Sequence, residues 1–268
     1  MSTSQLAASL IPDIIALAQR AGEKIMSIYA EDFSVSDKAD QSPLTAADLA
    51  AHQTICAGLA ELTPDIPVLS EESASVPFHK RSQWTRYWLV DPLDGTKEFI
   101  KRNGEFTVNI ALIENHRAIL GVVLIPARRQ CYYATLATGA FRQDENQLPQ
   151  ALHVTRPAAR PLRVVGSRSH ASQELADYVA RLGEHTFVPV GSALKFCLIA
   201  EGSADIYPRL GLTSEWDTAA AQCVVEAAGG QVLTLEGKPL QYNQKESLLN
   251  PYFLVFGDSG RDWLQYLP

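Results

Sequence analysis

The spacing of apolar residues changes along this sequence, and that change restricts the possible folds more than any other feature. Residues 10, 14, 17, 21, 25 and 28 are apolar at steps of three and four, which predicts an amphipathic helix with Pro12 in its first turn. A second helix is expected from Thr45, where Thr45 and Asp48 form a T-x-x-D capping pattern, to about residue 62. Two long helices therefore open the chain.

Short β-rich runs follow these helices, and they predict a mostly antiparallel sheet. The runs are 67–69, 87–90, 107–113, 121–125 and 130–135, with residues 127–129 joining the last two like a hairpin. From about residue 163 strands and helices alternate instead. Strands are expected at 163–165, 187–190, 204–207, 231–235 and 252–256, and helices at 172–182, 192–201 and from 216 to the glycine pair 229–230.

This order predicts a mixed α/β protein with two subdomains. Residues 1–150 would form an α+β subdomain that carries most of the candidate ligands, and residues 151–268 an α/β subdomain. The polar, proline-containing segment 144–161 is the expected boundary between them.

Composition excludes several classes of function. The chain has 268 residues, and its 23 Lys and Arg against 30 Asp and Glu give a net charge of −7 without a basic stripe, so polymeric nucleic acid is not an expected partner. A small anionic substrate would need local cations or metals. The four cysteines are widely separated, which predicts reduced thiols. The N-terminus lacks a signal-peptide pattern and the longest apolar run, 118–127, is short, so we expect a cytoplasmic protein without an integral membrane segment.

Most of the candidate chemistry lies in residues 87–96, where a predicted buried strand runs directly into Asp91. Pro92 is expected to stop the strand ladder, and residues 94–96 to open a helix. Two carboxylates three residues apart can share hard cations, while a helix N-terminus with the small Gly95 lets backbone donors approach a phosphate. The alternative is an ordinary turn, since Pro, Asp and Gly are common turn residues.

Two other acidic segments bear on this choice. Residues 68–72 form another short apolar strand ending in acid, and carboxylates that converge at neighbouring strand ends repel unless cations lie between them. Asp217, in the sequence SEWD before an alanine-rich helix, fits either a capping box or a metal ligand, and Asp48 leaves the same two interpretations open. Both roles can coexist, because a capping carboxylate can direct its second oxygen at a metal.

In order and spacing, four motifs resemble those of the inositol monophosphatase superfamily of metal-dependent, lithium-sensitive phosphatases. They are SPLTAAD at 42–48, SEE at 70–72, WLVDPLDGT at 88–96 and EWDTAA at 215–220. Residues 97–111, 167–170 and 191–202 are similar to the CysQ-type 3′(2′),5′-bisphosphate nucleotidase branch. The resemblance covers nearly the whole chain and implies a layered αβαβα sugar-phosphatase fold with metals between the subdomains.

The resemblance also implies a site for two to three Mg²⁺ ions. Glu71, Asp91 and the carbonyl of Leu93 would hold one ion, and Asp91, Asp94 and Asp217 a second, with a third near Glu71. Thr96 and Asp48 match the pair that orients and deprotonates the attacking water, and Glu71 is a rival base. Glu72 would lie outside the ligands. Inhibition by Li⁺ and Ca²⁺ is expected on the same basis.

The implied reaction is hydrolysis of the 3′-phosphate of 3′-phosphoadenosine 5′-phosphate (PAP) to AMP and phosphate, by in-line attack of a water that Mg²⁺ activates. 3′-Phosphoadenylyl sulfate (PAPS), converted to adenylyl sulfate, is a second candidate substrate, and the expected roles are sulfur assimilation and PAP recycling. Lys195 is a candidate contact for the nucleotide, and the alternative interpretation is a surface lysine whose apolar stem lies along the protein. The expected substrate contacts are Glu71, Leu93, Asp94, Gly95, Thr96, Ser167, Arg168, His170, Ser192, Lys195, Arg209 and Asp217.

Two other functions remain open at this stage. An inositol monophosphatase with broad sugar-phosphate tolerance would use the same metal core, and a catalytically silent metal or nucleotide sensor would keep the ligands without turnover. We expect a monomer or weak homodimer. Association with the cytoplasmic face of the inner membrane would be peripheral only, since no basic amphipathic helix stands out.

Overall fold

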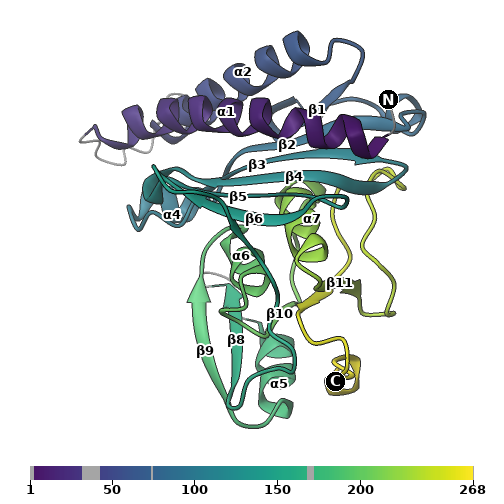
Figure 1. Cartoon of the computed structure of the whole chain (residues 1–268). Helices are drawn as coiled ribbons and strands as arrows, with labels where there is room; N and C mark the ends of the chain where they lie inside the picture. The colour runs from purple at the N-terminus through teal and green to yellow at the C-terminus, as the bar shows by residue number, and fades with distance from the viewer. Residues whose placement is uncertain (1–2, 32–42, 74, 168–171, 268) are drawn as a thin grey trace.

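Layers of helix and sheet alternate through the molecule, as Figure 1 shows. The computed structural model describes residues 3–31, 43–73, 75–167 and 172–267. Helices α1 and α2 cover one face of the first sheet, α6 and α7 lie between the two sheets, and α5 covers the outer face of the second. This arrangement confirms the predicted αβαβα order.

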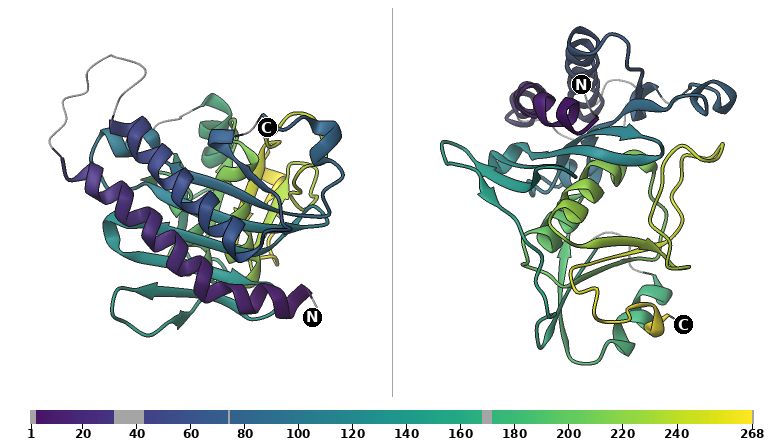
Figure 2. Two further views of the ribbon diagram at one scale, coloured as in Figure 1. Left: turned by 90° about the horizontal axis from the view of Figure 1, so that it is seen from above. Right: turned by 45° about the vertical axis from the view of Figure 1, so that its right-hand side comes forward.

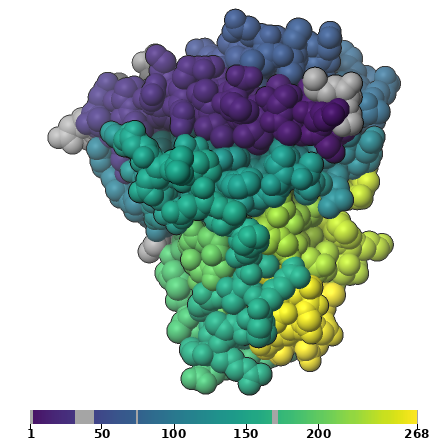
Figure 3. Space-filling view, in the orientation of Figure 1, coloured from purple at the N-terminus to yellow at the C-terminus, as the bar shows by residue number. Residues whose placement is uncertain are grey.

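The helices are close to the expected segments. Those described are α1 (Thr3–Tyr29), α2 (Pro43–Leu62), α3 (Phe78–Arg81), α4 (Thr96–Ile100), α5 (Gln173–Arg181), α6 (Leu194–Ala200) and α7 (Ala219–Ala227). Short 3₁₀ turns occur at η1 (Glu71–Ser73), η2 (Pro126–Arg128), η3 (Glu215–Asp217) and η4 (Leu264–Tyr266). Viewed from above, α1 and α2 run side by side across the first sheet (Figure 2). In the space-filling view of Figure 3, α1 lies along the top of the molecule above the strands.

The first sheet has the order β1-β2-β3-β4-β5-β6-β7, in which β1 and β2 are parallel and the other pairs antiparallel. Its strands are β1 (Val68–Ser70), β2 (Arg86–Asp94), β3 (Thr107–Glu114), β4 (Arg117–Ile125), β5 (Gln130–Thr135), β6 (Gly139–Asp144) and β7 (Gln150–Ala151). The second sheet has the order β11-β12-β10-β8-β9. Its strands are β8 (Leu162–Ser167), β9 (His185–Val190), β10 (Ile206–Arg209), β11 (Gln231–Thr234) and β12 (Phe253–Phe256).

Residues 152–161 connect the two sheets and lie within the expected boundary segment 144–161. The division into subdomains 1–150 and 151–268 stays a prediction, because α7 packs closely on the first sheet as well as on the second. An added Cβ at Gly121 of β4 would lie 2.2 Å from the carbonyl oxygen of Ala220. Only glycine therefore allows α7 to approach β4 so closely.

Two local predictions about proline are wrong. Pro12 lies well inside α1 rather than in its first turn, since the helix already begins at Thr3, and the proline sits on the exposed side of the helix. There the carbonyl that loses its helical partner can be solvated. Pro92 does not end the ladder, because β2 continues to Asp94 through a register shift between Asp91 and Asp94. A bulge of this kind tolerates the missing N–H of proline.

Asp205, which precedes β10, anchors the start of β8. Its carboxylate accepts hydrogen bonds from the Arg163 backbone N–H (2.8 Å), from the Arg163 guanidinium (2.8 and 3.0 Å) and from the Ala159 N–H (3.1 Å). Burial alone would raise the pKa of Asp205, but the hydrogen bonds from Arg163 more than offset it and hold the pKa below its usual value. The ionised carboxylate is therefore part of the folded structure.

Asp205→Ala is expected to lower the free energy of unfolding by about 3 kcal/mol, because it leaves Arg163 without its partner. The lowered pKa means that this contribution is complete above the unfolded pKa of about 3.9 and disappears as the pH falls through the folded value. Urea unfolding at pH 7 and at pH 3 measures both effects. An equal loss at the two pH values would contradict the assignment.

Within the described residues, no helix is long and apolar enough to cross a bilayer.

Candidate active site at the ends of β1 and β2

A cavity of about 320 Å³ lies at the ends of β1 and β2, and both sheets contribute to its wall. Arg168 and His170 lie outside the described residues. Asp48 does not line the cavity, but its carboxyl group lies next to those of Glu71 and Glu72. The structure brings together all of the expected metal ligands and most of the expected substrate contacts at this cavity: Glu71, Asp91, Leu93, Asp94, Gly95, Thr96, Ser167, Ser192, Lys195, Arg209 and Asp217.

Strand pairing explains why Glu71 and Asp91 meet. β1 and β2 are parallel, and Ser70 pairs with Val90, so Glu71, just after β1, and Asp91, the next residue of β2, lie side by side. The two carboxyl groups are within hydrogen-bonding distance of one another. The expectation that these two acidic strand ends lie side by side is confirmed.

Asp91 is the most deeply buried of the acidic residues that line the cavity, with 1% of its surface exposed. Its Oδ1 accepts a hydrogen bond from the Leu93 N–H at 3.1 Å. Burial raises the pKa of Asp91 well above its ordinary value, and the charges of Asp94, Glu71 and Asp217 raise it further. A buried carboxylate among other carboxylates is a costly arrangement that a cation would relieve.

Asp94 joins the two sheets at this cavity. Its Oδ2 accepts a hydrogen bond from the Ala193 N–H at 2.6 Å, at the turn that precedes α6, and from Thr107 Oγ1 at 3.4 Å in β3. Burial raises its pKa, although the nearby Lys195 and the hydrogen bonds from Ala193 and Asn109 act in the opposite direction. The carboxylate is therefore held in one orientation by backbone and side chain together.

Asp217 makes the capping interaction that the sequence left open as one of its two roles. Its Oδ2 accepts a hydrogen bond from the Ser214 N–H at 2.8 Å, and the Ser214 side chain completes the capping box. Burial raises the pKa of Asp217 to about 7, with Asp94 as the second cause. The capping interaction is confirmed, and Asp217 still lines the cavity with the other acids.

Backbone geometry at Gly95 allows the start of α4 to face the cavity. Gly95 has φ of +98°, and an added Cβ would lie 3.2 Å from the Glu105 carbonyl oxygen. Other residues rarely adopt this left-handed conformation. Helix α4 begins at Thr96, which confirms the predicted helix start after Asp94.

Two cationic side chains, Lys195 and Arg209, line the same cavity. Lys195 is 5% exposed, its Nζ donates to the carbonyl of Ser192 at 2.5 Å, and it lies over the Tyr207 ring at 5.4 Å. Burial lowers its pKa to about 8. The alternative of a surface lysine is therefore wrong. Arg209 donates from Nη2 to the Leu212 carbonyl at 2.5 Å, and its Nε is buried without a hydrogen-bond partner.

The carboxyl group of Asp48 faces Glu72 and Glu71 from α2. The Oδ1 atom of Asp48 is buried without a hydrogen-bond partner. The carboxyl group as a whole interacts with that of Glu72 through a side-chain hydrogen bond. Burial raises the pKa of Asp48 to about 8, and the charges of Glu72 and Glu71 raise it further. Glu72, set outside the ligands by the sequence, is thus a direct neighbour of the candidate base.

These groups fit a hard divalent cation chemically. Carboxylate and carbonyl oxygens are the ligands that Mg²⁺ prefers, and the buried carboxylates of Asp91, Asp94 and Asp217 raise one another's pKa values. In the part of the chain that the structure describes, no three His, Cys, Asp or Glu side chains are already arranged around one point. The structure therefore gathers the donors at one cavity without closing them into a finished coordination shell.

Sequence reasoning missed several residues of the cavity wall. Gly191 is one of them: an added Cβ would lie 2.4 Å from Glu98 Cγ, and the Gly191 N–H donates to Glu105 at 2.9 Å. The only sequence signal for Gly191 was its position as the first residue of the motif at 191–202. The others are Lys97, Glu98, Phe196, Tyr207, Leu212, Thr213 and Thr218.

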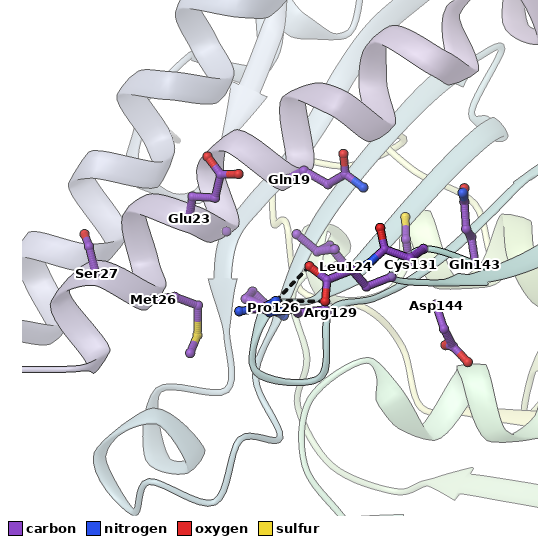
Figure 4. A pocket seen from close by; sticks show the side chains of 13 residues that line it. Gln19, Glu23, Met26, Ser27, Leu124, Pro126, Arg129, Cys131, Gln143 and Asp144 are labelled. Carbon is purple, nitrogen blue, oxygen red and sulfur yellow. Dashed lines mark hydrogen bonds and ion pairs between the residues drawn. The ribbon is translucent and has the colours of Figure 1, made fainter. Parts of the chain in front are cut away.

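A larger cavity, of about 670 Å³, lies between α1 and strands β4 to β6 (Figure 4). Arg129 at its mouth is paired with Glu145 at 2.8 Å, and Asp144 is paired with Arg142. The thiol of Cys131 in its wall is buried, which raises its pKa to about 12. Arg129 and Asp144 thus already have partners, and the described wall lacks a cluster of carboxylates like that at β1 and β2, so size alone does not make it the candidate active site.

The model of the inositol monophosphatase family matches residues 8–255. The chain belongs to this family. Enzymes of the family are metal-dependent phosphatases, generally with Mg²⁺, which agrees with the acidic cavity. The expected superfamily membership is confirmed.

Several similar proteins are named 3′(2′),5′-bisphosphate nucleotidase CysQ. The chain is 53% identical to the 3′(2′),5′-bisphosphate nucleotidase CysQ of Escherichia coli O157:H7, over 92% of this chain and 99% of that protein. It is 44% identical to the CysQ of Buchnera aphidicola, over 91% and 92%.

Solved structures agree with this family. The crystal structure of CysQ from Bacteroides thetaiotaomicron is 42% identical, with a TM-score of 0.84 over 95% of this chain and 98% of that one. An inositol monophosphatase from Zymomonas mobilis, at 22% identity and a TM-score of 0.80 over 99% of both chains, shares the fold.

Proposed function

We propose that this chain is a Mg²⁺-dependent 3′(2′),5′-bisphosphate nucleotidase that hydrolyses the 3′-phosphate of PAP to give AMP and phosphate. The observation that carries the proposal is that buried carboxylates and two cationic side chains line one cavity. Carboxylates suit Mg²⁺, and Lys195 and Arg209 suit the second phosphate of such a nucleotide. The 53% identity to a bisphosphate nucleotidase supports a substrate of this class. PAPS is proposed as a second substrate on the family resemblance alone.

Each residue group has a distinct part in this reaction. Glu71, Asp91, the Leu93 carbonyl, Asp94 and Asp217 would hold Mg²⁺, which when bound lowers the pKa of water and neutralises phosphate charge. The N–H groups of Gly95 and Thr96 would bind phosphate oxygens. The Thr96 hydroxyl would accept a hydrogen bond from the attacking water and pass its own proton toward Asp48.

The proposal includes finer points, some of which follow from the family resemblance and others from the sequence pattern. We infer two to three Mg²⁺ ions, inhibition by Li⁺ and Ca²⁺, and a cytoplasmic protein that is a monomer or weak homodimer. Peripheral association with the cytoplasmic face of the inner membrane belongs to the same expectation.

Phosphate release from PAP and from inositol 1-phosphate, measured side by side, tests the function. We expect a strong preference for PAP that requires Mg²⁺ and is lost on addition of Li⁺, because the cavity offers cations for a second phosphate. A preference for the inositol ester would agree with the proposed metal site but would contradict PAP as the substrate. No turnover on either compound would favour a silent sensor.

Arg209→Gln tests which residue recognises the nucleotide, with inositol 1-phosphate as the comparison substrate. It removes a guanidinium whose Nε lacks a partner, and Arg209 is not among the proposed metal ligands. The KM for PAP should rise by about 10-fold or more, the usual scale for a lost charge-assisted hydrogen bond. Hydrolysis of inositol 1-phosphate should change little. An equal loss on both substrates would contradict the role of Arg209 in nucleotide recognition.

A further inference from the structure

The loop 242–250 runs along the segment that carries Asp217. The Asn250 N–H donates to the Thr213 carbonyl at 2.8 Å, and the Glu215 N–H donates to the Leu248 carbonyl at 2.8 Å. A β-bridge between Ser214 and Leu249 lies between these two bonds. A short antiparallel contact therefore joins this loop to the residues just before Asp217.

The side chain of Asn250 adds three contacts to that segment. Its Nδ2 lies 2.7 Å from the Ser214 carbonyl oxygen, 3.2 Å from Thr213 Oγ1 and 3.1 Å from Thr218 Oγ1. The Ser214 carbonyl can only accept, so it fixes the amide with its nitrogen toward the segment. Asn250 is 5% exposed and is absent from the described cavity wall. It therefore contacts both sides of the Asp217 turn without reaching the cavity.

The turn that Asn250 holds determines where the Asp217 carboxylate lies. The Ser214 N–H donates to Asp217 Oδ2 at 2.8 Å, and the Asp217 N–H donates to the Ser214 carbonyl at 3.2 Å. Thr213 and Thr218, on either side, line the cavity. A shift of Ser214 or Thr218 would therefore move Asp217 relative to Asp91 and Asp94.

Buried hydrogen bonds also hold the part of the loop near residues 243–245, so Asn250 belongs to a loop that is fixed to the rest of the protein. Arg81, 2% exposed, donates to Asn243 Oδ1 at 2.5 Å and to the Lys245 carbonyl at 3.1 Å. The Asn243 N–H in turn donates to Glu215 Oε2 at 2.8 Å. These buried contacts fix the loop to α3 and to the 3₁₀ turn η3.

We propose that Asn250 is a positioning residue for Asp217: its buried amide clamps the 213–218 turn and so sets the orientation of the Asp217 carboxylate toward the metal. This inference rests on the proposed function, because it takes Asp217 as a metal ligand. Residues that orient a ligand from behind typically change metal affinity by 10- to 100-fold when they are removed.

The test is the affinity of the purified full chain for Mn²⁺ alone, which binds the same oxygen ligands as Mg²⁺ and is measured by electron paramagnetic resonance without substrate. Asn250→Leu keeps the branched shape of the side chain and removes its hydrogen bonds. We expect Mn²⁺ binding about 10-fold weaker than in the parent. Tyr178→Phe is the matched control, since it removes a buried hydrogen bond, from the Tyr178 hydroxyl to the Trp263 carbonyl, in the core between α5 and the second sheet.

A double-mutant cycle with Asp217→Asn separates this inference from the proposed function. If Asn250 acts through Asp217, Asn250→Leu weakens Mn²⁺ binding in the parent but adds less than about twofold in the Asp217→Asn background. If Asp217→Asn weakens binding and Asn250→Leu does not, the positioning role is overturned and the proposed function stands. If Asp217→Asn itself has no effect, Asp217 is not a ligand and both fail.

Thermal unfolding of each variant checks for general damage. A loss of Mn²⁺ affinity in Tyr178→Phe equal to that in Asn250→Leu would show a nonspecific effect and overturn the proposal. If Asn250→Leu does not fold, Asn250→Ala is used in the same cycle, because it introduces no new bulk at this buried position. The same expected and contradicting results apply to it.

Discussion

Asp91→Asn is expected to lower the turnover of PAP by about 10³-fold or more while the protein stays folded. Asp91 is the ligand proposed for both ions, and the loss of several kcal/mol of metal-dependent stabilisation corresponds to a rate effect of this size. The substitution keeps the shape of the side chain and removes only its charge. The measurement is phosphate release at saturating PAP over a series of Mg²⁺ concentrations.

Although Asp91→Asn should lose activity, its stability in the absence of Mg²⁺ should be equal to or greater than that of the parent. Burial and the charges of Asp94 and Glu71 raise the pKa of Asp91, so its ionised form destabilises the fold at neutral pH. Asp91→Asn removes that repulsion, and the melting temperature without Mg²⁺ should be equal to or above that of the parent. The increase in melting temperature that Mg²⁺ gives the parent by mass action should be much smaller.

Asp13→Asn is the matched control, since Asp13 is an exposed carboxylate of α1. It should leave turnover and the response of melting temperature to Mg²⁺ unchanged. An active Asp91→Asn enzyme with a normal dependence on Mg²⁺ would refute the assignment of Asp91. A variant that melts far below the parent would show that the charge supports the fold, contrary to its raised pKa.

Local patterns in the sequence predicted the acidic part of the site well. Asp91 and Asp94 lie in the last part of one buried strand, Gly95 follows it, and Glu71 follows the neighbouring parallel strand, so the pairing of these strands brings them together. The amphipathic period of α1 was equally visible, because its buried residues recur every three or four positions. In these cases one segment of sequence contains the whole signal.

Other features depend on contacts between distant segments, and the sequence could not reveal them. Asn250 reaches the turn around Asp217 only because the loop pairs with it, and nothing in the residues near 250 indicates that pairing. The buried state of Lys195 follows from the position of α6 between two sheets, whereas its local pattern also fitted a surface lysine. Strand β6 was missed because half of its residues are polar and only Ala140 is fully buried.

The proposed proton transfer from Thr96 to Asp48 leads to the second large expected effect. Asp48→Asn and Thr96→Val should each lower kcat for PAP by about 10²- to 10⁴-fold, the range for a lost general base. Asp48 is the more exacting test, because its Oδ1 is buried without a partner next to the cavity acids. The KM for PAP should change little, since neither side chain is assigned to the nucleotide's cationic contacts.

The double variant decides whether the two residues act as one unit. If Thr96 passes its proton to Asp48, Asp48→Asn combined with Thr96→Val should be hardly slower than the slower single variant, because the second loss removes nothing further. Fully multiplicative effects would contradict the relay. Glu71→Gln distinguishes the rival base: as a proposed ligand, Glu71 should also raise the Mg²⁺ concentration needed for half-maximal activity, whereas Asp48→Asn should not. If Asp48→Asn shifts the Mg²⁺ requirement as strongly as Glu71→Gln does, Asp48 contributes to metal binding, and the deprotonation of water would have to be assigned to another carboxylate of this cavity.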